Sequence, residues 1–269
     1  MISTVITGAG GRMGQSLIRL LANSATLRLH AAVDAPGSGS IGKDAGRIAG
    51  LDANGVMVAE DLAGALRGAQ LLIDFSVATA TTGHLQLAAE ARVAMLIGTT
   101  GLDAPTYAAV DSAARRIAVL PSTNTSAGVA LLASLVERSA RALPDEFNIE
   151  IIEVHHKHKR DAPSGTALTL AEAAARGRGG TLESLRAPID RNANQSRPDA
   201  QIGITSVRGG DVVGEHEILF LGPGERLVFR HTATNRSLFA RGALQAGAWL
   251  VRQAPGRYRM ADVFGLKDQ

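Results

Sequence analysis

The chain has 269 residues, of which 45% are hydrophobic and 20% charged, a balance typical of a soluble globular protein with one large or two modest domains. The absence of cysteine excludes disulfides and thiolate chemistry and favours the cytoplasm, and no apolar run approaches the ~18 residues of a membrane span. A net charge of +3 is weak evidence for nucleic-acid binding, and an aromatic content of 3% is low for a protein that stacks bases. We therefore expect small anions rather than nucleic acid or a membrane as partners.

About the first 120 residues alternate short β-like runs with helical runs rich in Ala and Leu. The opening residues, MISTVITGAG, predict a strand and not a secretory signal. Strands that alternate with helices form a parallel sheet with crossover helices, so we expect an α/β architecture here. The predicted strands are 3–8, 27–34, 71–76, 94–101 and 117–122, and the predicted helices are 12–23, 61–68, 81–92 and 104–116.

The pattern changes near Ser126, where we place a boundary between two architectures. The turns RGGD (208–211) and GPGE (222–225) are short enough for antiparallel pairing of the last three predicted strands. The predicted helices are 126–143, 164–178 and 237–253, the predicted strands are 147–154, 201–208, 211–221 and 226–233, and 186–201 is predicted to be a long polar loop.

A glycine loop follows the first predicted strand and opens the first helix. Gly8, Gly11 and Gly14 are spaced G-x-x-G-x-x-G, with Arg12 and Met13 between the last two. Glycines let the backbone approach a pyrophosphate, and a helix N-terminus offers N–H groups to it. The context predicts a dinucleotide site, and the alternative is an ordinary glycine-rich turn.

Asp34 ends the second predicted strand, about 20 residues after the glycine loop, where dinucleotide-binding folds carry an acidic residue. A carboxylate at this position accepts hydrogen bonds from an adenosine ribose and repels a 2′-phosphate. Ala35 follows it, so no arginine is placed to hold that phosphate. We therefore expect NADH to be used at least as well as NADPH; the alternative is an acid on a surface loop.

Two later strand ends carry small and hydroxyl residues. Residues 74–76 end one strand, with Phe75 at the centre, and residues 98–101 end another, with Thr99 and Thr100. Ligands of open α/β sheets lie outside the carboxyl ends of the strands. These ends could accommodate a nicotinamide and its ribose, although ordinary turns explain them as well.

Residues 153–168, EVHHKHKRDAPSGTAL, concentrate positive charge in one short stretch. If 155–159 is extended, His155, Lys157 and Lys159 share one face. The lysines would repel a metal ion and no further ligand closes a zinc site, so we expect none. A nucleic-acid patch would be broader and would include aromatic residues. A solvated basic strand remains an alternative.

An anion pocket accounts for more of this stretch. Ser164, Gly165 and Thr166 precede a helical run, so backbone N–H groups at the helix start would face a carboxylate or phosphate. Lys159 can hold a second anionic group or donate a proton, and His155 titrates near neutral pH and suits acid–base work. A dianionic small molecule fits such a site.

The chain resembles the 4-hydroxy-tetrahydrodipicolinate reductase (dihydrodipicolinate reductase) family over about residues 2–265. The motifs that carry the resemblance are GAGGRMG, DFS, GTTG, IEIIEVHHKHKRDAPSGTAL and SVRGGDVVGEHEILFLGPGERLVFRHTATNRSLFARGAL. The resemblance implies a Rossmann-like parallel-sheet domain (1–126 and 236–269). It also implies a second α+β domain with a mixed, largely open sheet for substrate binding and oligomerisation (127–235).

The resemblance further implies an activity and its residues. The activity is NAD(P)H-dependent reduction of 4-hydroxy-tetrahydrodipicolinate to tetrahydrodipicolinate, with loss of water, by a homotetramer on the diaminopimelate route of lysine biosynthesis. His155 would be the proton donor or acceptor and Lys159 the proton donor. The substrate carboxylates would contact His156, Lys159, Ser164, Gly165 and Thr166. The cofactor would contact Gly8, Gly11, Arg12, Met13, Asp34, Phe75, Gly98, Thr99, Thr100, Ser122, Thr123, Asn124 and Thr125.

Two other functions remain open at this point. One is a catalytically silent NAD(H)-binding sensor, which would have no need of His155, Lys159 and the Ser-Gly-Thr turn. The other is a related amino- or hydroxy-acid dehydrogenase, which gives no reason for tandem histidines before that turn.

Overall fold

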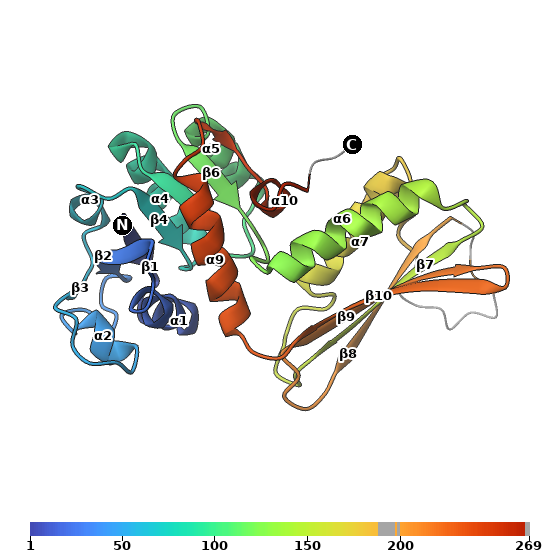
Figure 1. Cartoon of the computed structure of the whole chain (residues 1–269), viewed down its shortest axis with the longest axis horizontal. Helices are drawn as coiled ribbons and strands as arrows, with labels where there is room; N and C mark the ends of the chain where they lie inside the picture. Colours follow the sequence, from blue (N-terminus) through green and yellow to red (C-terminus); the bar gives the residue numbers. More distant parts are fainter. Residues whose placement is uncertain (188–196, 198–199, 267–269) are drawn as a thin grey trace. The chain divides into compact units, whose positions relative to one another are not determined.

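The computed structural model describes residues 1–187, 197 and 200–266 and divides into two compact units (Figure 1). The first unit combines Met1–Ser126 with Ser237–Gly265, and the second is built mainly from Ala127–Arg236. The predicted polar loop 186–201 lies largely outside the described residues. Across the described part of the chain, every helix is too short or too polar to cross a membrane.

The first unit contains a seven-stranded parallel sheet, which confirms the predicted Rossmann-like architecture. The strand order is β11-β6-β5-β4-β1-β2-β3, and all neighbouring pairs are parallel. The direction of winding reverses between β1 and β4, where open α/β sheets bind their ligands. The strands are β1 (Ile2–Thr7), β2 (Leu27–Val33), β3 (Val58–Ala59), β4 (Leu71–Asp74), β5 (Ala94–Ile97), β6 (Ala118–Pro121) and β11 (Gly256–Arg257).

Helices on this sheet bury its central strands, which are mainly apolar. The residues of β4, LLID, are all buried, and β5, AMLI, is buried from its second residue on. Such runs are typical of parallel strands that are covered on both faces. The helices are α1 (Arg12–Leu21), α2 (Ala45–Ile48), α3 (Leu62–Ala65), α4 (Ala78–Ala91), α5 (Ala104–Ala113), α9 (Ser237–Leu250) and α10 (Met260–Val263).

Helix α9 returns to the first unit after the chain has built the second. Its sequence, SLFARGALQAGAWL, buries small residues that allow a close approach to its neighbours. A Cβ on Gly242 would lie 1.7 Å from the carbonyl oxygen of Thr125, and one on Gly247 would lie 2.6 Å from Leu71. Gly242 is therefore required for α9 to pack where it does, and a side chain at Gly247 would force Leu71 to move.

The second unit contains a four-stranded mixed sheet. The order is β10-β9-β7-β8; β7 pairs with β8 in parallel and with β9 antiparallel, and β9 and β10 form an antiparallel hairpin. The predicted GPGE hairpin is therefore confirmed. The strands are β7 (Asn148–His155), β8 (Ile202–Arg208), β9 (Gly214–Gly222) and β10 (Glu225–Ala233).

The predicted RGGD hairpin is wrong, because β7 lies between β8 and β9. The loop at 209–212 instead spans the end of β7 and bonds to the chain that leaves it. The N–H of Gly209 donates to the carbonyl oxygen of His155 at 3.0 Å, and the N–H of Lys157 donates to that of Gly210 at 3.2 Å. These bonds satisfy backbone groups that a hairpin would have paired.

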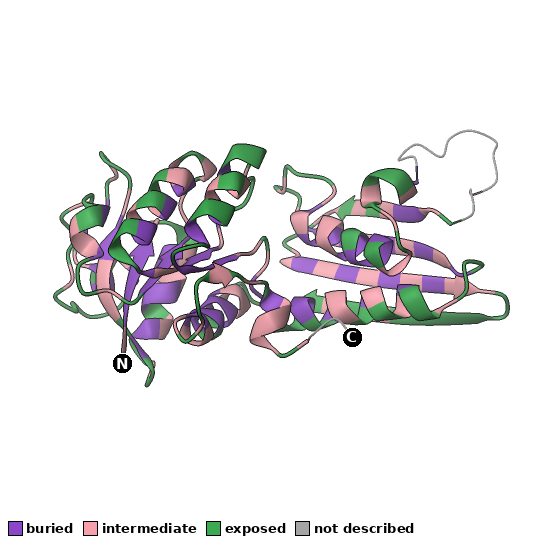
Figure 2. Ribbon diagram, turned by 90° about the horizontal axis from the view of Figure 1, so that it is seen from above, coloured by how far each residue is buried: buried purple, intermediate pink, exposed green. Residues whose placement is uncertain are grey.

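Helices α6 (Ala127–Ala142) and α7 (Gly165–Gly177) lie side by side and pack on this sheet, and the single turn α8 (Leu182–Leu185) adjoins α7 (Figure 1). The strands consequently alternate between buried and less buried residues (Figure 2). The core includes Ile149, Ile151, Leu170, Ile218 and Phe220. Alternation of this kind is typical of a sheet that is covered on one face.

Candidate active site

The inner face of β7 changes from apolar to polar at its carboxyl end. Ile149 and Ile151 belong to the core, and Glu153 and His155 continue the same face because successive residues of a strand alternate. Glu153 is fully buried and His155 is 8% exposed. A buried carboxylate and a nearly buried imidazole need partners, and the structure supplies them.

Glu153 is held by hydrogen bonds from several residues. Its Oε1 accepts from Nη2 of Arg208 at 2.7 Å and from the N–H of Ser164 at 3.1 Å. Its Oε2 accepts from Nη1 of Arg208 at 2.8 Å and lies 2.5 Å from Nδ1 of His155. Burial opposes ionisation, but the bonds from Arg208, Ser206 and His155 outweigh it and lower the pKa of Glu153 to about 2.

His155 is neutral at physiological pH. Burial lowers its pKa, and the charges of Lys159 and Arg208 act in the same direction. The hydrogen bond and charge of Glu153 raise the pKa but do not reverse the shift. His155 is therefore an uncharged imidazole beside an ionised carboxylate.

The chain turns sharply after His155, so residues 155–159 are not extended and their side chains do not alternate between two faces. Strand β7 ends at His155, and the next residues form a turn in which the N–H of Lys159 donates to the carbonyl oxygen of His156 at 3.1 Å. Lys157 and His158 are exposed. The Lys159 side chain is 21% exposed, and its ammonium lies 2.8 Å from Oδ1 of Asp161.

The N-terminus of α7 lies beside this network. Ser164 caps the helix, and its Oγ accepts from the N–H of Ala167 at 3.1 Å and lies 3.2 Å from Nε2 of His216. Burial lowers the pKa of His216 to about 4, so this ring is neutral as well. Gly165 and Thr166 form the first turn, where backbone N–H groups point out of the helix end.

In the first unit, the glycine loop at the end of β1 requires two of its glycines. Gly8 has φ +71°, and a Cβ on it would lie 2.3 Å from the carbonyl oxygen of Phe75. A Cβ on Gly14 would lie 2.3 Å from the carbonyl oxygen of Gly8. Gly11 caps α1 without a side chain, which leaves the helix end open next to Arg12. The loop therefore fits the pyrophosphate of a dinucleotide.

Asp34 supports this loop from β2. Its Oδ2 accepts from the N–H of Gly10 at 3.0 Å and from the hydroxyls of Ser38 at 3.0 Å and Ser40 at 2.7 Å. Its Oδ1 accepts from the N–H of Ala35 at 2.9 Å. Burial opposes ionisation of Asp34, but these hydrogen bonds outweigh it and lower the pKa of the carboxyl group. Asp34 is therefore charged. Since Oδ1 accepts one described bond, it keeps capacity for a ribose hydroxyl.

The other predicted cofactor residues lie at the ends of β4, β5 and β6. A Cβ on Gly98 would lie 2.2 Å from the ring of Phe75, so the two strand ends touch. Oγ1 of Thr99 accepts from the N–H of Ser76 at 3.0 Å, and Thr100 is exposed. These residues share one edge of the sheet with the glycine loop.

The segment 122–125 closes this edge after β6. The hydroxyl of Ser122 donates to the carbonyl oxygen of Asn124 at 2.7 Å, which shapes the turn around Thr123. Thr125 is 2% exposed and donates to the carbonyl oxygen of Phe239 at 2.6 Å. The Thr125 hydroxyl thus fixes this segment to α9 within the unit.

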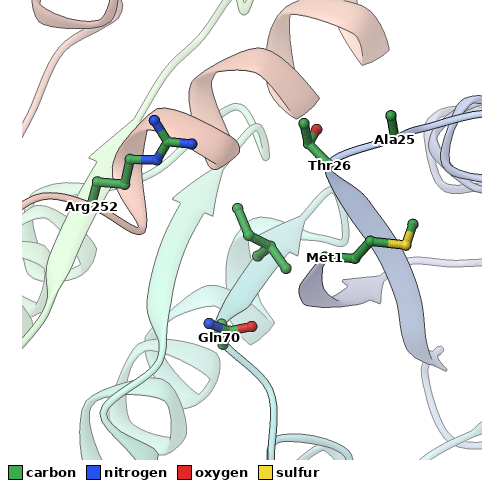
Figure 3. A pocket seen from close by; sticks show the side chains of 6 residues that line it. Met1, Ala25, Thr26, Gln70 and Arg252 are labelled. Carbon is green, nitrogen blue, oxygen red and sulfur yellow. The ribbon is translucent and has the colours of Figure 1, made fainter.

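A cavity of about 290 Å³ lies at the opposite, amino-terminal edge of this sheet (Figure 3). No residue predicted from the sequence to bind a ligand lines it. The lining residues are Met1, Ile2, Ala25, Thr26, Gln70 and Arg252. Because ligands of such sheets bind at the carboxyl edge, this cavity is not the functional site.

Sequence reasoning did not assign a role to four residues of the second unit. Glu153 could have been found, because it stands two residues before His155 on one strand face. Arg208, Gly214 and His216 could not, because they reach His155 only through the pairing of β8 and β9 with β7.

The strand order, the glycine loop and the acid after β2 together define a protein of the dinucleotide-binding class. Comparison with known proteins identifies the family. The family described as "Dihydrodipicolinate reductase, N-terminus" matches residues 2–125, and "Dihydrodipicolinate reductase, C-terminus" matches residues 128–264. The chain belongs to the dihydrodipicolinate reductase family.

Individual relatives agree with this assignment. The 4-hydroxy-tetrahydrodipicolinate reductase of Ruegeria pomeroyi is 49% identical over 97% of each chain, and that of Anaeromyxobacter dehalogenans is 49% identical over 99% of each. A solved structure, the dipicolinate-bound dihydrodipicolinate reductase from Paenisporosarcina sp. TG-14, has a TM-score of 0.75 at 24% identity. It covers 97% of this chain and 98% of its own, and it shares the fold.

Proposed function

We propose that the protein reduces 4-hydroxy-tetrahydrodipicolinate to tetrahydrodipicolinate with NADH or NADPH and releases water, on the diaminopimelate route to lysine. The overall change adds one hydride and one proton to the substrate and removes one water. Membership of the family and relatives with this name at 49% identity support the substrate. The observation that carries the proposal is the bond from Ser164 N–H to Glu153, which brings His155 and the start of α7 together.

The start of α7 and the lysine would bind the two substrate carboxylates. We assign Ser164, Gly165 and Thr166 to one carboxylate, because N–H groups at a helix N-terminus attract anions. We assign Lys159 and His156 to the other. Dipicolinate in the Paenisporosarcina relative, itself a dicarboxylate, supports this class of ligand.

Proton transfer is assigned to two side chains. Lys159, paired with Asp161, is a cation that can donate a proton to the substrate. Neutral His155 can accept a proton and return it. With these groups on opposite protonation states, one can release a proton while the other takes one up.

The first unit would hold the cofactor, which supplies a hydride when bound. We assign the pyrophosphate to Gly8, Gly11, Arg12 and Met13 at the start of α1, and the adenosine ribose to Asp34. The nicotinamide end would lie along the remaining strand ends, at Phe75, Gly98, Thr99, Thr100, Ser122, Thr123 and Asn124, with Thr125 fixing the loop to α9. On this assignment 1–126 and 236–269 form the cofactor domain, and 127–235 forms the substrate and assembly domain.

We also propose a homotetramer in the cytoplasm. The face of the four-stranded sheet opposite α6 and α7 carries apolar side chains, and Val207 and Val228 on it are 44% and 46% exposed. An exposed apolar surface of this kind suits assembly of identical subunits. Light scattering tests the mass, and a monomer would contradict the assembly but not the activity.

A coupled assay tests the function. The substrate is made in the cuvette by a synthase from pyruvate and aspartate semialdehyde, and loss of NADH absorbance is followed. Oxidation of NADH that depends on both precursors supports the proposal. A silent NAD(H) sensor would bind NADH without consuming it, and a related dehydrogenase would respond to an amino or hydroxy acid in place of the synthase product.

A further inference from the structure

Glu153 and His155 form the closest pair in the second unit's site. They stand two residues apart on one face of β7, and Nδ1 of His155 lies 2.5 Å from Oε2 of Glu153. An ionised carboxylate can only accept a hydrogen bond, so Nδ1 carries the proton. The other ring nitrogen, Nε2, is then the one left with a lone pair.

The carboxylate that makes this bond cannot turn. Arg208 on β8 donates one hydrogen bond to each oxygen of Glu153, from Nη2 to Oε1 at 2.7 Å and from Nη1 to Oε2 at 2.8 Å. This paired geometry fixes the plane of the carboxylate. The N–H of Ser164 donates to Oε1 at 3.1 Å. Glu153 therefore joins three things in one rigid group: the His155 ring, β8 and the start of α7.

A glycine at the start of β9 keeps Nε2 of His155 free of a crowding side chain. Gly214 begins β9 next to this ring, and a Cβ on Gly214 would lie only 3.0 Å from Nε2 and 3.4 Å from Cδ2. Any larger residue there would crowd the nitrogen that Glu153 leaves unprotonated. Glu153 therefore holds the Nδ1 side of the ring, and the glycine at 214 places no side chain against the Nε2 side.

Four ionisable groups face His155 from the elements around it. They are Glu153 on β7, Arg208 on β8, His216 on β9 and Lys159 in the turn after β7. The His216 ring packs edge-on against the His155 ring, with centroids 5.2 Å apart. Only Glu153 among the four is negative, so it alone stabilises the imidazolium form of His155.

We infer that Glu153 is a positioning residue that fixes the Nδ1–H tautomer of His155, so that Nε2 is the nitrogen that exchanges a proton with the substrate. The inference rests on the proposed function for the identity of that substrate. The tautomer itself is a property of the protein alone. Removal of Glu153 should therefore change the state of His155 as well as the rate.

The first test needs no substrate and no variant of Glu153. Two-dimensional ¹H–¹⁵N spectra of the wild-type chain above pH 7, with His155 assigned by His155→Gln, report which nitrogen carries the proton. We expect protonated Nδ1 and bare Nε2. An Nε2–H tautomer of His155 overturns the inference even if the protein proves to be the proposed reductase, and the expected tautomer supports it even if the substrate is another.

The second test uses Glu153→Gln. Arg208 should take the amide oxygen of the new residue, which turns its NH₂ group toward Nδ1 and selects the Nε2–H tautomer. We expect kcat to fall about 100-fold with KM for the substrate changed only a few-fold, and the acid limb of the kcat–pH profile to move to lower pH. Unchanged kcat and an unmoved limb would contradict the inference.

Glu137→Gln is the matched control. Glu137 on α6 is also bound by arginines, with its Oε1 3.0 Å from Nη2 of Arg141 and its Oε2 3.0 Å from Nη2 of Arg176. The control should keep kcat and its pH profile. If Glu153→Gln does not fold, Glu153→Asp is the second variant, because it keeps the charge but withdraws it from Nδ1. The same loss of kcat and the same change of tautomer are expected. Wild-type kcat in Glu153→Asp would overturn the inference.

Discussion

The ammonium of Lys159 lies 2.8 Å from Oδ1 of Asp161, whose side chain is 59% exposed. Burial opposes ionisation of Asp161, but the hydrogen bond and charge of Lys159 outweigh it and lower the pKa of this carboxyl group. An exposed carboxylate is a weak partner, because water competes for it. A substrate carboxylate can therefore join or replace Asp161 on the lysine without a large cost.

Loss of either proton-transfer group should slow turnover strongly. We expect His155→Gln and Lys159→Ala each to lower kcat by at least about 100-fold, as removal of a general acid or base does. Steady-state rates in the coupled assay measure this. Lys157→Ala is the control, because Lys157 is exposed and belongs to the same turn. Near wild-type turnover in either site variant would contradict the assignment.

The architecture of the first unit could be predicted because its central strands are mainly apolar. Runs such as LLID and AMLI between helical segments require a sheet that is covered on both faces, and β4 and β5 are buried in this way. The glycine loop could also be predicted from the sequence, because its structure requires glycine at fixed positions. The positive φ of Gly8 and the close contact between Gly14 and Gly8 both exclude a side chain.

The topology of the second unit could not be predicted from turn length. A short RGGD segment between β8 and β9 suggested neighbours, whereas β7 lies between these strands. Sequence spacing does not say which strands pair, and here the loop bonds to the carboxyl end of β7 instead. For the same reason His155 and Ser164 were found from their motif, but Arg208 and His216, which come from the flanking strands, were not.

Cofactor preference should follow from Asp34. We expect kcat/KM with NADH at least equal to that with NADPH, since the charged Asp34 repels a 2′-phosphate. Initial rates with each cofactor test this, and a preference for NADPH above about tenfold would refute it. Ala35→Arg, at an exposed position, should raise the NADPH/NADH ratio because it supplies a cation for that phosphate.

The glycine loop should tolerate no side chain at Gly14. A Cβ there would lie 2.3 Å from the carbonyl oxygen of Gly8 and 2.7 Å from Cα of Ala9, so Gly14→Ala must displace the loop. We expect the Kd for NADH, measured by fluorescence titration, to rise at least about tenfold, about 1.4 kcal/mol. Gly83→Ala in α4, which would meet no atom within 4 Å, is the control. It should leave Kd unchanged and raise Tm slightly through helix propensity.

Stability should fall in mild acid because of His216. Its pKa is about 4 in the folded chain and 6.5 when unfolded, so between these values the unfolded chain binds more protons. The free energy of unfolding should therefore decrease as pH falls from 6.5 toward 4, by roughly 3 kcal/mol for this group. His216→Gln should flatten the dependence of Tm on pH in this window, although His155 acts in the same direction. An unchanged slope would contradict the assignment of a buried neutral imidazole.

The most direct measurement is a crystal structure of the protein with pyridine-2,6-dicarboxylate and NADH. The account predicts one carboxylate within hydrogen-bond distance of Nζ of Lys159 and the other at the backbone N–H groups of Gly165 and Thr166 at the start of α7. A dicarboxylate bound away from Lys159 and Thr166, with these groups in contact with solvent only, would contradict it.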